Sequence, residues 1–345
     1  MARLSSVSRG LVILAVAVCS AAAQAPKTGD INFYGLRKLA PDKILRTLEL
    51  KSGDPLPPSK GDLEDRLELM PGVAAARVEA VCCEGPNAIL FIGIEERGSP
   101  HFDTRQAPAG TASLPEDIMA AYREYMGAVA RAAQLGNAAE DLTAGESRIA
   151  DPAARRFEEQ FAGLAADRIE VLRDVLRNGA EPEERAVAAA VIGYAPKKDQ
   201  VIKDLQFAMQ DAEPAVRANA VRAMMAIAVL AQKRPDLGLR IEPTWMVEML
   251  NSIVLGDRQQ AALALVTLTE QRNAATLELI RARALPALVE MARWKTLGYA
   301  LPAFLLVGRA GGVPEQELLD QWKQGDRETA IEKATAPAPK ARRGK

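Results

Sequence analysis

The chain has few of the side chains on which most enzymes depend, and its charge is balanced. Its 345 residues include one histidine and three cysteines, and aromatic residues make up 4%. A single histidine removes the commonest general base from almost the whole chain, and it cannot supply the three or four ligands of a zinc site. With 44 basic and 45 acidic residues, no net charge attracts nucleic acid. We therefore expect no catalytic, cofactor-binding or metal-binding residues.

What the chain has in quantity is small apolar residues. Hydrophobic residues make up 48%, and much of this share is alanine. A composition rich in alanine and poor in aromatics favours closely packed helices over β-sandwiches or barrels. The length exceeds what one hydrophobic core usually organises. We therefore expect a multi-domain protein in which helices predominate.

Two segments 32 positions apart have nearly the same amino-acid sequence. The first is AEPEERAVAAA (180–190) and the second is AEPAVRANAVR (212–222), so Pro182 recurs as Pro214 and Arg185 as Arg217. A period of this size in helix-forming sequence indicates stacked helical hairpins, which usually form a binding surface. Two weaker copies follow, with helices expected at 245–254, 259–268, 285–293 and 299–308.

These units resemble HEAT repeats, including the short type found in bilin-lyase-like proteins, in their turn proline and in the arginine of the second helix. The resemblance implies an all-α solenoid, which we place at 151–330 with Asp151 and Pro152 at the start of its first helix. We expect Arg185 and Arg217 to bond to turn carboxylates and backbone. A row of arginines that binds a ligand is the alternative.

Residues 24–98 show a different pattern, in the order strand, helix, helix, strand, strand. Ser59 with Asp62 is typical of a helix start, and Pro71-Gly72 of a helix end. Four segments resemble the POTRA (polypeptide transport-associated) domain in sequence and order: INFYGLRKLAPDKIL, LKSGDPL, LEDRLELMPGVAAARVE and AILFIGIEER. The resemblance implies a small α+β, protein-binding module that often accepts a partner's strand at its sheet edge.

The strand pattern yields candidate partner-binding residues. Because neighbouring residues in a strand point to opposite faces, Cys82 should face the helices while Val81, Cys83 and Phe91 flank the other face. We expect Cys82 to be a buried thiol and Cys83 a half-exposed one. A Cys83–Cys83 dimer and a vicinal disulfide stay open as alternatives.

The first 23 residues have the layout of a secretory signal. Basic residues precede an apolar run from Leu11 to Cys19, and Ala21 and Ala23 fit the small-residue rule for cleavage near Ala23. We therefore expect export to the periplasm. A lipoprotein anchored at Cys19 is disfavoured because Val18 occupies a position where a small residue is required.

The remaining segments connect or extend these parts. We expect a Gly/Pro-rich linker at 99–114, a helical connector at 115–150 and a disordered basic tail at 331–345. His101 in the linker could pair with Asp103 as a base, but no activated nucleophile accompanies it.

The sequence as a whole predicts an exported, non-catalytic scaffold in a bacterial envelope. Its partners would be other proteins or extended peptide segments, and peripheral association with the outer membrane or its assembly proteins stays open. The alternative is an enzyme, either a bilin-lyase-like HEAT protein or a hydrolase. It is disfavoured by the single histidine and by repeats that contain neither cysteine nor histidine.

Overall fold

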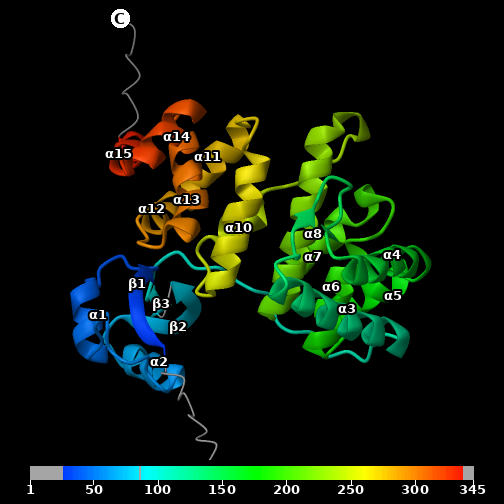
Figure 1. The fold of residues 1–345 in the computed structure, drawn as a ribbon, viewed down its shortest axis with the longest axis horizontal. Helices are drawn as coiled ribbons and strands as arrows, with labels where there is room; N and C mark the ends of the chain where they lie inside the picture. The colour runs from blue at the N-terminus through cyan, green and yellow to red at the C-terminus, as the bar shows by residue number, and fades with distance from the viewer. Residues whose placement is uncertain (1–25, 85–86, 337–345) are drawn as a thin grey trace, which may run out of the picture.

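The computed structural model describes residues 26–84 and 87–336, except for the side chains of Cys83 and Glu84. The predicted signal peptide, Cys19 and the end of the basic tail lie outside this part. Within it, a small mixed sheet with two helices precedes a long array of helices (Figure 1).

The N-terminal part is a three-stranded sheet with two helices on one face. Its elements are β1 (Lys27–Tyr34), α1 (Pro41–Leu48), α2 (Lys60–Glu68), β2 (Val73–Glu84) and β3 (Asn87–Glu96). The central strand β3 pairs in parallel with β1 and antiparallel with β2. Pro41 opens α1, and the Ser59 hydroxyl accepts the Asp62 amide at 3.1 Å, as the sequence predicts. The predicted order of strands and helices is therefore confirmed.

The second face of this sheet is covered by the helical part. Phe91 is completely buried, with its ring centre 5.0 Å from that of Trp294 and 5.3 Å from that of Tyr299. Val81 is half-buried against the same core. The expectation that Val81 and Phe91 flank a face open to partners is wrong for Phe91, because tryptophan and tyrosine rings of the same chain occupy that face.

The two neighbouring cysteines also differ from the expectation. Cys82 is exposed and takes part in a disulfide, so the prediction of a buried thiol against the helices is wrong. Val78 on the same strand is buried against the helices, and therefore the predicted orientation of the strand holds there. The side chain of Cys83 lies outside the described part.

The helical part contains four helix pairs in the order of the sequence. The pairs are α5 (Ile169–Asn178) with α6 (Pro182–Ile192), α7 (Ile202–Ala208) with α8 (Pro214–Lys233), α9 (Thr244–Met249) with α10 (Leu255–Leu268), and α12 (Leu285–Ala292) with α13 (Leu297–Ala310). The other helices are α3 (Glu116–Gln134), α4 (Pro152–Asp167), α11 (Ala274–Arg283), α14 (Glu315–Gln324) and α15 (Glu328–Thr335). Short 3₁₀ turns lie at Lys198–Gln200 and Pro235–Leu237. The second helices α6, α8, α10 and α13 pack in succession.

Buried arginines join successive pairs. Arg185 donates from Nε to Asp211 at 2.9 Å and from Nη1 to the carbonyl oxygens of Gly179 and Ala180 at 3.0 and 2.8 Å. Each arginine therefore ties its own turn to an aspartate of the next pair. A guanidinium group suits this task because its donors point in several fixed directions and it remains charged when buried.

Arg217 repeats the arrangement one pair later. It donates from Nη2 to Asp257 at 2.7 Å and from Nη1 to the carbonyl oxygens of Asp211 and Ala212 at 2.7 and 2.9 Å. Arg185 and Arg217 are at most 2% exposed. We call these residues, with Arg258 described next, the arginine ladder.

Arg258 is the third member of the ladder. It stands fourth in α10, as Arg185 does in α6 and Arg217 in α8, and it donates to the Ser252 carbonyl oxygen at 2.5 Å. Its guanidinium lies 4.9 Å from the ring centre of Tyr34, the last residue of β1. The ladder therefore ends on the N-terminal sheet.

Polar contacts complete this joint between the sheet and the last helix pairs. The Asn32 side chain donates to Thr296 Oγ1 at 3.1 Å and accepts from the Lys295 amide at 2.7 Å. The Tyr34 hydroxyl donates to the Ile253 carbonyl oxygen, and the Trp294 indole donates to the Phe33 carbonyl oxygen. The N-terminal sheet is thus fixed to the far end of the array (Figure 1).

Residues 99–114 run back along the turns of the array. The Arg105 amide donates to the Gln210 carbonyl oxygen at 2.7 Å, and its guanidinium lies 3.2 Å from the Phe207 ring centre. Farther on, Thr111 pairs with Gly179, and the Leu114 amide donates to Glu184 at 2.6 Å. The predicted flexible linker is therefore a bonded strap, and we use that name for it below.

Two further segments differ from the sequence-based prediction. The connector at 115–150 holds the helix α3 but also a short hairpin of β4 (Glu140–Asp141) and β5 (Arg148–Ile149). The predicted tail begins too early, because α15 extends to Thr335 and buries Ile331 and Ala334.

Among the described helices, α8 alone is long and apolar enough to cross a membrane by length and composition. In this fold its apolar residues form the core between neighbouring pairs, with Val216, Ala220, Val221 and Met224 at most 1% exposed. Its polar residues also bond to other elements, Arg217 from the buried side and Asn219 and Arg222 from the other side. We therefore interpret α8 as the central core helix of the array.

The arginine ladder generates a stability prediction. Replacement of Asp257 by alanine leaves the buried Arg217 charge without its carboxylate, so the free energy of unfolding should fall by about 3–5 kcal/mol. The control is Glu278→Ala, which breaks the exposed pair with Arg281 and should change that free energy by no more than about 1 kcal/mol. Urea unfolding of both variants measures the difference. Equal losses would show that the ladder contributes no more than a surface ion pair.

Candidate binding groove on the inner helices

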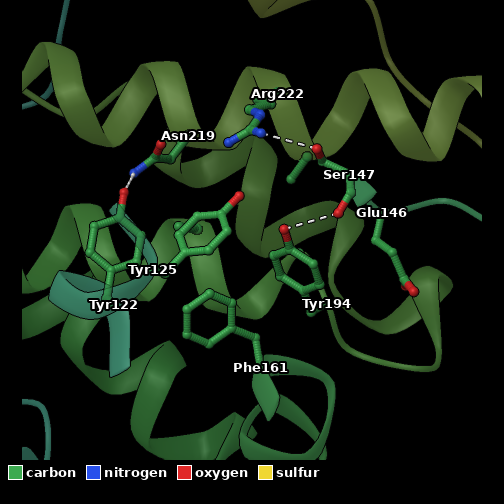
Figure 2. Close-up of a pocket in the computed structure, with 11 residues that line it drawn as sticks. Tyr122, Tyr125, Glu146, Ser147, Phe161, Tyr194, Asn219 and Arg222 are labelled. Carbon is green, nitrogen blue, oxygen red and sulfur yellow. Dashed lines mark hydrogen bonds between the residues drawn. The ribbon is translucent and has the colours of Figure 1, made fainter. Parts of the chain in front are cut away.

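The second helices α6, α8 and α10 pack in succession, and α3 and the β4–β5 hairpin border their shared surface. An aromatic pocket, shown in Figure 2, has rings from α3, from α4 and from Tyr194 just after α6. The ring centres of Tyr125 and Phe161 are 5.3 Å apart, and those of Phe161 and Tyr194 are 5.5 Å apart. The cavity they enclose measures about 30 Å³. That is room for one or two water molecules, not for a substrate.

The buried carboxyl group of Glu158 contacts two tyrosines of the pocket. Glu158 Oε1 accepts from the hydroxyls of Tyr125 at 3.0 Å and Tyr194 at 3.4 Å, and Oε2 accepts from the Ile149 amide at 2.9 Å. Burial raises the pKa of Glu158, although these hydrogen bonds and the charge of Arg222 oppose the shift. Burial likewise raises the pKa of Tyr125 to about 12. The tyrosines are therefore neutral donors that fix the carboxyl group.

Arg222 of α8 connects the pocket to the β4–β5 hairpin. Its guanidinium donates to Ser147 Oγ at 3.0 Å (Figure 2). It also forms an ion pair with Glu140 at 2.9 Å. Lys198 holds the same hairpin through Glu146 at 2.7 Å. The hairpin is thereby attached to the repeats as a wall, and the charge of Arg222 is already satisfied within the chain.

From this pocket a groove continues across the inner helices. One hollow of about 500 Å³ lies over α6 and the start of α8, and another of about 220 Å³ lies over α8 and α10. Asn219 lines both hollows and the aromatic pocket. We call this continuous surface the inner groove. Its apolar lining residues include Tyr122, Ala186, Val187, Ala215, Ala218, Val221, Met225 and Leu263.

Asn219 is held in one orientation at the centre of the groove. Its amide nitrogen donates to the Ala186 carbonyl oxygen at 2.8 Å. It also donates to the Tyr122 hydroxyl at 3.4 Å (Figure 2). Sequence reasoning missed this residue, although the repeat contains the signal. In the first copy Val187 and Ala190 occupy the positions that Asn219 and Arg222 occupy in the second. Asn219 and Arg222 are thus polar at positions that are apolar in the first copy, and both line the groove.

The residues that the sequence singled out lie elsewhere. Pro182 and Pro214 open α6 and α8, and the arginines that follow them are buried in the ladder and line neither hollow of the groove. Pro182 also lines the rim of the groove. Phe91 lies in the joint between the sheet and the array. The sequence therefore identified residues that build the repeats, and the groove is made by their neighbours.

His101 does approach Asp103, as the sequence suggested. Its Nε2 lies 2.9 Å from Asp103 Oδ1, and both side chains are exposed on the strap. Backbone and carboxylate hydrogen bonds raise the pKa of His101. A hollow of about 390 Å³ adjoins the pair, and among its described lining residues there is no serine or cysteine that could act as a nucleophile.

Comparison with known proteins bears on the repeats. Residues 169–237 match the family model of HEAT repeats. The match covers α5 to α8, the two pairs whose wording recurs. No curated protein matches the chain. The C-terminal part therefore contains HEAT-like repeats, and two of the three helices of the groove, α6 and α8, lie within the matched residues.

The raised pKa of Glu158 generates a pH prediction. A carboxyl group whose folded pKa lies above its ordinary value of 4.5 contributes stability below that pH and loses it as the pH rises through the folded pKa. Glu158→Gln mimics the protonated form. The free energy of unfolding of the wild type, relative to this variant, should therefore fall as the pH rises from about 4.5. The slope should reach at most about 1.4 kcal/mol per pH unit. A relative free energy that stays constant with pH, or rises, would contradict the raised pKa.

Proposed function

We propose that this protein is a non-catalytic adaptor, exported to the bacterial envelope, that holds an extended segment of another protein in the inner groove. The observation that carries the proposal is the groove itself. It is a continuous, largely apolar surface across three packed inner helices, and the alanines over α6 and the start of α8 let a partner's backbone approach. HEAT-like repeats commonly serve as interaction surfaces, which is compatible with this role.

The sheet is less suited to the partner than the sequence suggested. The outward amides of Ala76 and Val78 on β2 already donate to Glu68 at 3.0 Å and Glu64 at 2.8 Å. At the other edge, Thr28 of β1 exchanges backbone hydrogen bonds with residues 53 and 54. Carboxylates and a loop thus occupy hydrogen bonds that an added strand would need.

The finer assignments of the N-terminal part belong to the same proposal. Its order of strands and helices, with β3 between β1 and β2, supports a POTRA-like domain whose sheet face serves to anchor the repeats. Cleavage near Ala23 and release to the periplasm complete the proposal. The disulfide at Cys82 is compatible with an oxidising compartment.

In-cell crosslinking tests the proposed function. A photoreactive residue at Ala218, in the groove, should yield adducts with an envelope or exported protein. The same residue at Lys203, on the exposed side of α7, serves as the control and should yield few adducts. Leu263→Glu should abolish the adducts from Ala218, because it places a charge on the apolar lining.

Several results of these experiments would contradict the proposed function. Equal adducts from both positions, or adducts that survive Leu263→Glu in a folded protein, would show that the groove is not the binding surface. A chain recovered in the cytoplasm with its first 23 residues attached would contradict export.

A further inference from the structure

Two carboxylates on the rim of the inner groove have no ion partner among the described residues. They are Glu183, in the first turn of α6, and Glu213, the N-cap residue of α8, and both line the larger hollow. The other charged groups of the groove are paired, since Arg222 bonds to Glu140 and Glu146 bonds to Lys198. The uncompensated charge of the groove is therefore negative.

The surface next to these carboxylates fits an aliphatic stem with a cationic end. Ala186, Ala215 and Ala218 provide small apolar contacts, and the Tyr122 ring forms one side of the same hollow. Lysine and arginine bury their methylene groups along apolar surface while the charged end stays near water. An aromatic ring adds attraction for a cation. Cationic side chains are thus the best match to this hollow.

Asn219 provides a contact for a peptide backbone. Because its amide nitrogen is fixed by Ala186 and Tyr122, its carbonyl oxygen has a defined direction, and it accepts no hydrogen bond from any residue in the described part. A backbone N–H of an extended peptide is a suitable donor. Beyond it, Met225 and the exposed Leu263 offer an apolar contact over α8 and α10.

The distance across the three helices sets the length of the peptide that the groove can hold. Neighbouring packed helices lie about 8–10 Å apart, so three of them span about 16–20 Å. An extended chain advances about 3.3 Å per residue, which corresponds to about six residues.

We propose that the inner groove binds an extended segment of a partner protein in which a lysine or arginine lies beside Glu183 and Glu213 and an apolar residue contacts Leu263. This inference rests on the proposed function and specifies the chemistry of the partner. An acidic segment is excluded, because Arg222 already bonds to Glu140 and Ser147 and the remaining charge would repel it.

Selection of peptides from a random dodecapeptide library displayed on phage tests the proposal with the full chain as bait. The selected peptides should contain lysine or arginine together with an apolar residue. Each of Glu183→Gln and Glu213→Gln should weaken their binding by about two- to fivefold, as an exposed or half-buried ion pair supplies. The double variant should weaken it by about tenfold. The matched control is Glu124→Gln on α3, an exposed carboxylate outside the groove, which should leave the dissociation constant unchanged.

The contrary outcomes separate this inference from the proposed function. Selected peptides that lack basic residues, yet lose binding in Leu263→Glu, would overturn the cationic partner and leave the groove as a binding surface. Selection of no peptide, or of peptides indifferent to all these variants, would overturn both. Peptides that resemble residues 337–345, which contain four basic residues, would assign the groove to a second copy of this chain and overturn a different partner.

Discussion

The structure depends on buried arginines that each join one helix pair to the next. The guanidinium of Arg185 or Arg217 satisfies the carbonyl oxygens of its own turn and an aspartate of the following pair at the same time. A buried charge that loses its partner is costly, so each arginine fixes how far one pair is displaced from the next. The alignment of α6, α8 and α10, and with it the inner groove, follows from this spacing.

The third arginine extends the ladder into the N-terminal part. Arg258 has no aspartate of a following pair among its hydrogen-bond partners in the described structure, and it lies instead against the ring of Tyr34. Burial lowers the pKa of Arg258, although the group stays charged at neutral pH. Glu290, which accepts from the Gly35 amide and pairs with Arg37, contributes the nearby negative charge. The sheet therefore takes the place that a further turn would occupy.

The strap completes a closed path. The chain leaves the sheet at the last helix pairs, runs back along the turns through Arg105 and Thr111, and enters α3 beside the first pair. The hairpin that follows α3 then bonds to Arg222, which lines the groove. Segments before the repeats thus fix both ends of the array. A groove held in this way needs little ordering when a peptide binds.

The repeats could be predicted because their pattern lies within short stretches of sequence. The predictions that were wrong concern contacts between residues far apart in the chain. The proline and arginine of the first two pairs lie within a few residues of each other, so their pattern is visible in the sequence. Arg258 was missed because its turn, NSIVLGDR (251–258), lacks the Ala-Glu-Pro sequence, and the expected helix began one residue after it at Gln259.

The joint and the strap could not be found by the same means. The alternation of side chains along β3 places Phe91 on the face of the sheet opposite α1 and α2. It does not indicate that Trp294, about 200 positions later, covers this opposite face. The strap has no apolar period because its bonds come from backbone groups and one arginine. Its composition therefore resembles a flexible linker.

Hydrogen exchange of the full chain is the most direct test of the central claim that sheet, strap and repeats form one body. Four amides bond across its contacts, those of Gly35, Lys295, Arg105 and Leu114. Our account predicts that these amides exchange as slowly as the hydrogen-bonded amides in the middle of the repeat helices α6 and α8. Exchange at the rate of an unfolded chain at all four, with the repeat helices still protected, would contradict it.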